Sequence, residues 1–206
     1  MGLNAWFLNT SWISAQRHFV ADLVDAIRAQ GGSSLLSTVF SYGLQNEPYM
    51  CIDCYPYKVM SGKITTADGV QYDMSTGSDR HQSGDANFVH WVTQLADAIK
   101  AEDPAAMVSA YVIGEWDGPG VAIPSTPRDQ MQIPDVQAWD IFPRATVMSL
   151  YTSFIIDYLE YHVYIDPVLY ATGSPYSLSS YLSSSHSEFS QLNLSTMPVL
   201  AEEFGV

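Results

Sequence analysis

The sequence predicts an α/β fold in which parallel strands alternate with helices. Two long segments carry apolar residues at a helical period, and four segments rich in β-branched and aromatic residues lie between and after them. Strands that alternate with helices pair in parallel through right-handed crossover connections. With 206 residues and no evident linker, the chain is expected to form a single domain with a substantial core.

Two helices account for the periodic segments. The first is expected over residues 14–30, where apolar side chains share one face and Gly31-Gly32 follow as a stop signal. The second is expected to begin at Asp85, whose carboxylate would cap the free N–H groups of the first turn. It should end at Asp103-Pro104, because proline cannot continue a helix.

Strands are expected at residues 35–47, 106–114, 154–164 and 197–205. A hairpin insertion is predicted at residues 58–72, with Asp68-Gly69 at its turn. Residues 115–143 form a long proline-rich segment with little periodicity. In compact domains such a segment is usually a functional loop or a disordered one.

The charge balance excludes several classes of partner. Asp and Glu number 22 against 8 Lys and Arg, which gives a net charge of −14. Nucleic acids and anionic membranes attract positive surfaces, so neither is an expected partner and a neutral or cationic ligand fits better. No stretch approaches the ~20 apolar residues of a membrane span. The chain has no P-loop, dinucleotide fingerprint or nucleophile elbow, and no cofactor is expected.

Cys51 and Cys54 make a lone C-x-x-C pair. A tetrahedral zinc site needs four ligands and no second pair exists, so no metal site is expected here. The pair is interpreted as either a local disulfide or two free thiols.

Two glutamates end predicted strands. Glu47 follows the first strand and Glu203 closes the fourth. The carboxyl ends of parallel strands meet at one edge, which in a (β/α) barrel is the mouth that carries the reactive groups. The two-residue period of a strand places the following residues on one side of each strand: Gly43, Gln45 and Glu47 in the first, and Val199, Ala201 and Glu203 in the fourth. Both carboxylates are therefore expected to face the same cleft.

Three short motifs occur in order at strand ends: Asn46-Glu47-Pro48, His162-x-Tyr164 and Glu203-Phe204-Gly205. In order and spacing the chain resembles clan A glycoside hydrolases, most closely the cellulase-like family 5. The resemblance implies that Glu47 is the acid/base and Glu203 the nucleophile, and that Asn46 binds the sugar 2-hydroxyl. It also implies that the His-x-Tyr pair lies on the substrate side, with Tyr164 donating to Glu203.

The implied chemistry is that of a retaining glycosidase acting on β-linked oligo- or polysaccharides, as cellulases and mannanases do. One carboxylate attacks the anomeric carbon while a carboxylic acid about 5 to 5.5 Å away protonates the leaving oxygen. Two acids so close do not both ionise easily, so the proton is assigned to Glu47 and the charge to Glu203.

Neighbouring residues allow other assignments. Glu202 lies beside Glu203, and the Glu-Phe-Gly register favours Glu203 as the nucleophile, with Glu202 at the rim. Trp116 is interpreted either as a stacking platform for a sugar ring or as a packing residue under its loop. His18, His81, His90 and His186 show no metal-ligand spacing.

The resemblance also implies a partial fold. A complete TIM (β/α)8 barrel takes ~250 residues, and in the family three strand-helix units precede the Asn-Glu-Pro strand. Residues 1–206 are therefore expected to be a single incomplete catalytic domain that lacks the N-terminal three units and the last unit, and the predicted activity belongs to the complete enzyme. The first residues lack the pattern of a signal peptide, although secretion of the complete protein fits the family.

Two further hypotheses remain. One is another clan A activity with the same catalytic pair, such as β-mannanase, endoglycosylceramidase or exo-β-glucosidase, since loops set specificity. The other is a carbohydrate-binding relative without catalysis.

Overall fold

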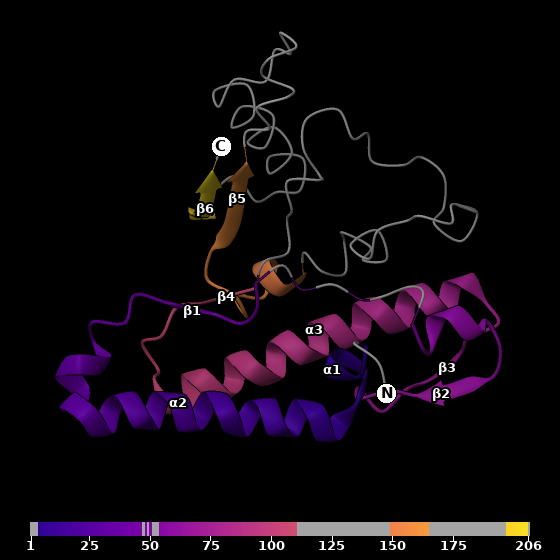
Figure 1. Ribbon diagram of the computed structural model, residues 1–206, viewed down its shortest axis with the longest axis horizontal. Helices are drawn as coiled ribbons and strands as arrows, with labels where there is room; N and C mark the ends of the chain where they lie inside the picture. The colour runs from indigo at the N-terminus through magenta and orange to yellow at the C-terminus, as the bar shows by residue number, and fades with distance from the viewer. Residues whose placement is uncertain are drawn as a thin grey trace, which may run out of the picture.

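The computed structural model describes residues 4–46, 48, 50, 54–110, 149–164 and 197–205, with the backbone alone at residues 161–164 and 201–205. Two long helices, α2 (Thr10–Leu36) and α3 (Gly77–Glu102), pack side by side. The parallel pair of β1 and β4 lies beside these helices, the parallel pair of β5 and β6 points away from them, and an antiparallel hairpin lies near the start of α3 (Figure 1).

Helix α2 begins and ends outside its predicted bounds. The short helix α1 (Ala5–Leu8) precedes it, and Asn9 caps α2 by accepting the N–H groups of Ser11 and Trp12 through Oδ1, at 3.0 and 3.2 Å. The predicted stop at the glycine pair is a break in the helix: Gly32 has φ +65°, and helical structure resumes as far as Leu36.

Helix α3 begins well before Asp85, so the predicted cap is wrong. Thr76 is the N-cap, and its Oγ1 accepts the N–H of Asp79 at 3.2 Å. Asp85 lies inside the helix and is only 1% exposed. The other end is confirmed, because α3 stops at Glu102 and Asp103 is its C-cap.

Both long-range strand pairs are parallel, as the alternation of strands and helices predicts. Strand β1 (Tyr42–Gly43) pairs with β4 (Val108–Ser109), and β5 (Leu159–Tyr164) pairs with β6 (Val199–Gly205). The described strands β1 and β5 are shorter than predicted. Residues 35–36 belong to α2, and Phe154, with φ +55°, follows a helical turn at residues 149–152.

The start of β5 lies against β4. The N–H of Asp157 donates to the carbonyl of Val108 at 2.9 Å, and the Oγ of Ser109 donates to the carbonyl of Tyr158 at 3.0 Å. The β1–β4 and β5–β6 pairs are separate two-stranded sheets, and these hydrogen bonds join β4 to the residues that directly precede β5. A partial barrel remains a prediction.

The hairpin insertion is confirmed. Strands β2 (Lys63–Thr65) and β3 (Gln71–Asp73) pair in antiparallel fashion. In the turn, Gly69 has φ +81°, a conformation that glycine adopts without steric cost. Asp68 Oδ1 accepts the hydroxyl of Thr66 at 2.7 Å and the N–H of Val70 at 3.0 Å. A 3-10 turn, η1 (Tyr57–Val59), precedes the hairpin.

The hydrophobic core lies between the helices and the strands. Phe7 of α1 packs against Phe88 and Trp91 of α3, with ring centroids 6.1 and 5.0 Å apart. The indole N–H of the fully buried Trp91 donates to Gln16 Oε1 at 2.8 Å, which ties α3 to α2. A second cluster includes Val24 of α2, Ile99 of α3 and Val108 of β4. The helices thus pack against β4 and the first residue of β5.

Candidate functional site

Alternation along the strands separates a helix-facing side from an opposite side. Leu44, Val108 and Leu159 pack in the hydrophobic clusters that the helices cover. Successive residues of a strand point to opposite faces. The residues between or beside these apolar positions therefore lie on the face away from the helices. Two polar strand residues lie on this face, Ser109 of β4 and Glu160 of β5. Together with Gln45, which follows β1, and Tyr158, which directly precedes β5, we call them the polar strand face.

The polar strand face is held together by hydrogen bonds that cross strands. Ser109 is fully buried, and its hydroxyl donates to the Tyr158 carbonyl. The phenol of Tyr158 donates to Ser41 Oγ at 2.8 Å, so this side chain reaches from β5 back to the start of β1. Gln45 Oε1 is buried and accepts no hydrogen bond within the described part of the chain. Polar side chains buried in this way are typical of a site interior rather than of a packed core.

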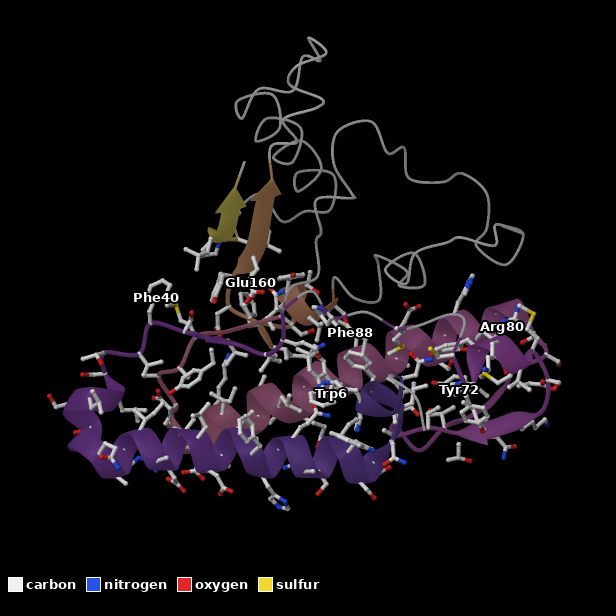
Figure 2. All side chains as sticks on the ribbon, in the orientation of Figure 1. Trp6, Phe40, Tyr72, Arg80, Phe88 and Glu160 are labelled. Carbon is white, nitrogen blue, oxygen red and sulfur yellow. The ribbon has the colours of Figure 1, made fainter. Side chains whose placement is uncertain are left out.

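Glu160 is the charged member of this face. It lies near the start of β5 and is 2% exposed (Figure 2). Burial raises the pKa of Tyr151 well above its ordinary value, and the nearby charge of Glu160 raises it further. The sequence analysis did not single out Glu160. The signal that could have found it is its spacing of two residues from His162 within one predicted strand.

Two of the three motifs, His162-x-Tyr164 and Glu203-Phe204-Gly205, lie side by side in the backbone of β5 and β6. His162 is the register partner of Glu203, and Tyr164 is the partner of Gly205. The register shifts after Tyr161, which pairs with Ala201, so Glu202 is an extra residue in β6. Such a bulge interrupts the two-residue alternation predicted for β6. The orientations of His162, Tyr164 and Glu203 side chains lie outside the description.

The remaining motif, Asn46-Glu47-Pro48, is described only in part. Asn46 is exposed and lies three residues beyond the end of β1, at its carboxyl end. Glu47 and Trp116 lie outside the described residues. The shared cleft for Glu47 and Glu203, and the short distance between their carboxyl groups, therefore remain predictions.

The alternatives left open for the cysteines are decided at Cys54, which is disulfide-bonded. The sequence contains one other cysteine, Cys51. Within the ranges that the structure describes, no group of three or more His, Cys, Asp or Glu side chains is arranged to hold a metal ion. No helix found there is both long and apolar enough to cross a lipid bilayer.

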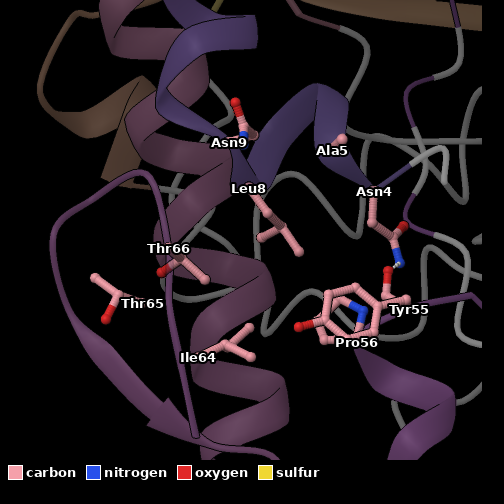
Figure 3. A pocket seen from close by; sticks show the side chains of 9 residues that line it. All are labelled: Asn4, Ala5, Leu8, Asn9, Tyr55, Pro56, Ile64, Thr65 and Thr66. Atoms are coloured by element: carbon pink, nitrogen blue, oxygen red, sulfur yellow. Dashed lines mark hydrogen bonds between the residues drawn. The ribbon is translucent and has the colours of Figure 1, made fainter. Parts of the chain in front are cut away.

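A separate small cavity lies between α1, the turn at Tyr55-Pro56 and β2 (Figure 3). Its volume is about 120 Å³, whereas pockets that bind small molecules usually measure roughly 300–1,000 Å³. Its two asparagines already have partners: Asn9 caps α2, and the Asn4 amide donates to the Tyr55 carbonyl at 3.2 Å. We assign this cavity no chemical role.

Comparison of the chain with protein-family models, curated proteins and solved structures finds no match.

Proposed function

We propose that this chain carries the catalytic pair of a retaining glycoside hydrolase that acts on β-linked glycans. The observation that best supports the proposal is the parallel register of β5 and β6, in which His162 is the partner of Glu203. In the family that the motifs resemble, the His-x-Tyr and Glu-Phe-Gly motifs occupy neighbouring strands. Two neighbouring strands of that kind must pair in parallel with the two motifs side by side, as β5 and β6 do in the backbone.

The polar strand face gives independent support. Gln45 and Glu160, which precede the motif residues Glu47 and His162 by two positions in the sequence, each have a buried side-chain oxygen. The opposite face is filled by apolar side chains under the helices. A sugar-binding cleft would use the polar face, because hydroxyl groups need hydrogen-bonding partners.

The reaction proceeds in two displacements. In the first, a carboxylate oxygen of Glu203 attacks the anomeric carbon, the glycosidic C–O bond breaks, and Glu47 gives its proton to the leaving oxygen. In the second, the ionised Glu47 takes a proton from water, the water oxygen bonds to the anomeric carbon, and Glu203 leaves as a carboxylate. The anomeric configuration is retained because it inverts twice.

The expected substrate is a neutral glycan. The net charge of −14 repels polyanionic chains such as nucleic acids, and it does not oppose binding of uncharged sugars. Trp116 would stack on a sugar ring and Asn46 would bind the 2-hydroxyl of the sugar at the cleavage site.

Covalent trapping tests the proposal. The complete enzyme that contains this chain is incubated with a panel of 2-deoxy-2-fluoro β-glycosyl fluorides, which form the glycosyl-enzyme but hydrolyse slowly, and the label is located by peptide mass mapping. We expect one label on Glu203, and its loss in Glu203→Gln. Glu202→Gln is the matched control and should label as the unsubstituted chain does. Glu47→Gln should slow turnover of natural glycans by about 10²–10⁴-fold, the usual contribution of a general acid–base.

Label on Glu202, or on any residue other than Glu203, would overturn the assignment of the nucleophile. A folded chain that binds the glycans, shown by calorimetry, but neither labels nor turns them over would be a carbohydrate-binding protein without catalysis.

A further inference from the structure

Helix α2 carries two apolar stripes, and its packing partners cover one of them. By the 3.6-residue period, Val20, Val24 and Ile27 share one face of the helix. They pack in the cluster that also contains Ile99 of α3 and Val108 of β4. A second stripe runs beside the first, and we call it the uncovered stripe. It consists of Trp12, Ala15, Phe19, Leu23 and Ala26, all of them exposed.

The uncovered stripe presents large side chains to solvent. Trp12 is 48% exposed, Phe19 67% and Leu23 42%. Trp6 of α1 is also exposed, and its ring centroid lies 5.8 Å from that of Trp12, so the two rings form one surface. Single exposed apolar residues are ordinary, but a continuous row of them along a helix marks an interaction surface.

Strand β1, into which α2 leads, has a free edge. The N–H groups of Tyr42 and Leu44 donate to carbonyls of the β4 segment at 2.9 and 3.0 Å. Successive residues of a paired strand direct their backbone groups to opposite edges, so those of Gly43 lie on the side away from β4. Within the described ranges, β4 is the sole partner strand of β1. Unpaired backbone groups of this kind are a template for a further strand.

The order of the elements determines where a further strand would lie. Helix α3 connects β1 to β4, which pair in parallel, and α2 packs beside α3 against the same cluster. Crossovers between parallel strands are right-handed, so successive crossover helices on one face of a sheet advance in the same direction. A strand that leads into α2 therefore pairs with β1 at the edge away from β4. The helix before that strand then packs against α2 on the side away from α3.

We propose that the uncovered stripe of α2 and the free edge of β1 form one interface, which a helix followed by a strand covers in the complete protein. Both elements precede α2 in the same polypeptide. The strand pairs in parallel with β1 and bonds to the backbone groups of Gly43, and the helix buries the large side chains of the uncovered stripe. This interface is independent of the proposed function, because no motif residue takes part in it.

Oxidative footprinting tests the helix side of the interface. The complete protein that contains this chain is given a short pulse of hydroxyl radicals, and oxidised residues are located by peptide mass mapping. Each rate is compared with that of the same residue in urea-unfolded protein, which removes differences in intrinsic reactivity. We expect Trp12, Phe19 and Leu23 to lose most of their reactivity on folding. Met60, the 63% exposed residue after η1, is the control and should keep it.

Hydrogen exchange, read at single residues by mass spectrometry, tests the strand side. The N–H groups of Tyr42 and Leu44 are protected by β4. We expect the N–H of Gly43 to exchange as slowly as these two in the complete protein, because the added strand accepts it. Fast exchange at Gly43 between two protected neighbours would overturn the pairing.

A photoreactive side chain identifies the occupant. Phe19 is replaced by p-benzoylphenylalanine in the complete protein, and the crosslinked peptides are sequenced. We expect the crosslink to join a peptide that precedes α2 in the same polypeptide, and the same replacement at Met60 should not give it. A crosslink between two copies of the protein would overturn the proposed occupant, and so would protection of Trp12 that appears only when a β-glycan is added.

If the replacement at Phe19 prevents folding, the footprint and the exchange of the unsubstituted protein decide the question. Oxidation of Trp12 and Phe19 at their unfolded rates would overturn the interface whether or not the protein hydrolyses glycans. Protection of both residues in a protein that no fluoroglycoside labels would support the interface and overturn the proposed hydrolase.

Discussion

Asp157 joins three elements through one side chain. Its carboxylate accepts the N–H of Val108 at 2.8 Å and forms an ion pair with Lys100 of α3, also at 2.8 Å. Its own N–H donates to the Val108 carbonyl, so both backbone groups of a fully buried β4 residue depend on it. The approach of β5 to β4 thus depends on the hydrogen bonds of Asp157 and Ser109 rather than on a continuous ladder.

We expect Asp157→Ala to lower the free energy of unfolding by about 1–3 kcal/mol, because the buried N–H of Val108 loses its acceptor. The control is Asp25→Ala. Asp25 pairs with Arg28 on the exposed side of α2, and a surface pair of this kind contributes about 0–1 kcal/mol. Urea unfolding followed by circular dichroism measures both, and equal losses would contradict the role given to Asp157.

At the scale of elements, tertiary contacts set the start of α3. Residues 77–85 are mostly polar and show no helical period, which is why the sequence indicated a later start. Hydrogen bonds to the end of the hairpin stabilise this part of the helix instead. Asp79 Oδ2 accepts the N–H of Asp73 at 2.8 Å, and Arg80 donates to the Met74 carbonyl at 2.7 Å. The first two turns of α3 are therefore stabilised by β3 and the turn after it.

Two glycines in these elements should respond oppositely to the same substitution. Gly84 lies inside α3, and a Cβ there would meet the Tyr57 hydroxyl at 3.5 Å and Met50 Sδ at 3.7 Å, which are ordinary contacts. Gly84→Ala is expected to stabilise the protein by about 0.5–1 kcal/mol, because glycine loses more backbone entropy in a helix. Gly69→Ala should destabilise it by about 1–2 kcal/mol, since the turn requires φ +81°.

Thermal unfolding at one pH measures both changes, and each glycine variant serves as the control for the other. A stabilising Gly69→Ala would contradict the hairpin turn, and a strongly destabilising Gly84→Ala would contradict the space found beside α3.

At the scale of the whole molecule, the large negative net charge opposes folding. The net charge of −14 makes the compact state repel itself. Among the described residues the ion pairs are those of Arg28 with Asp25 and Glu102, and of Lys100 with Asp157. These few pairs offset little of the repulsion, since each contributes modestly.

Added salt should therefore stabilise the protein. Raising the ionic strength from about 0.01 M to about 0.15 M shortens the screening length from about 30 Å to about 8 Å. We expect the midpoint of thermal unfolding to rise by about 2–4 °C, the shift that 1 kcal/mol produces at this chain length. Sodium chloride and choline chloride at equal ionic strength should act alike, and a lower midpoint in both salts would show that the ion pairs outweigh the repulsion.

The sequence by itself determined the features that depend on neighbouring residues. The hairpin turn at Asp68-Gly69 and the end of α3 at Asp103 follow from local chemistry, the first from a residue that accepts positive φ and the second from a proline. The parallel pairing of strands followed from their alternation with helices. The three motifs of the candidate site were also visible as sequence.

The tertiary structure alone decided the features that depend on distant contacts. The extra residue Glu202 in β6 follows from the register with β5, and the Thr76 cap comes with hairpin contacts that support the first turns of α3. Glu160 could not be recognised as buried from its own strand, since an isolated glutamate is normally solvated. Burial is a property of what packs around a residue, and those neighbours come from elements far away along the chain.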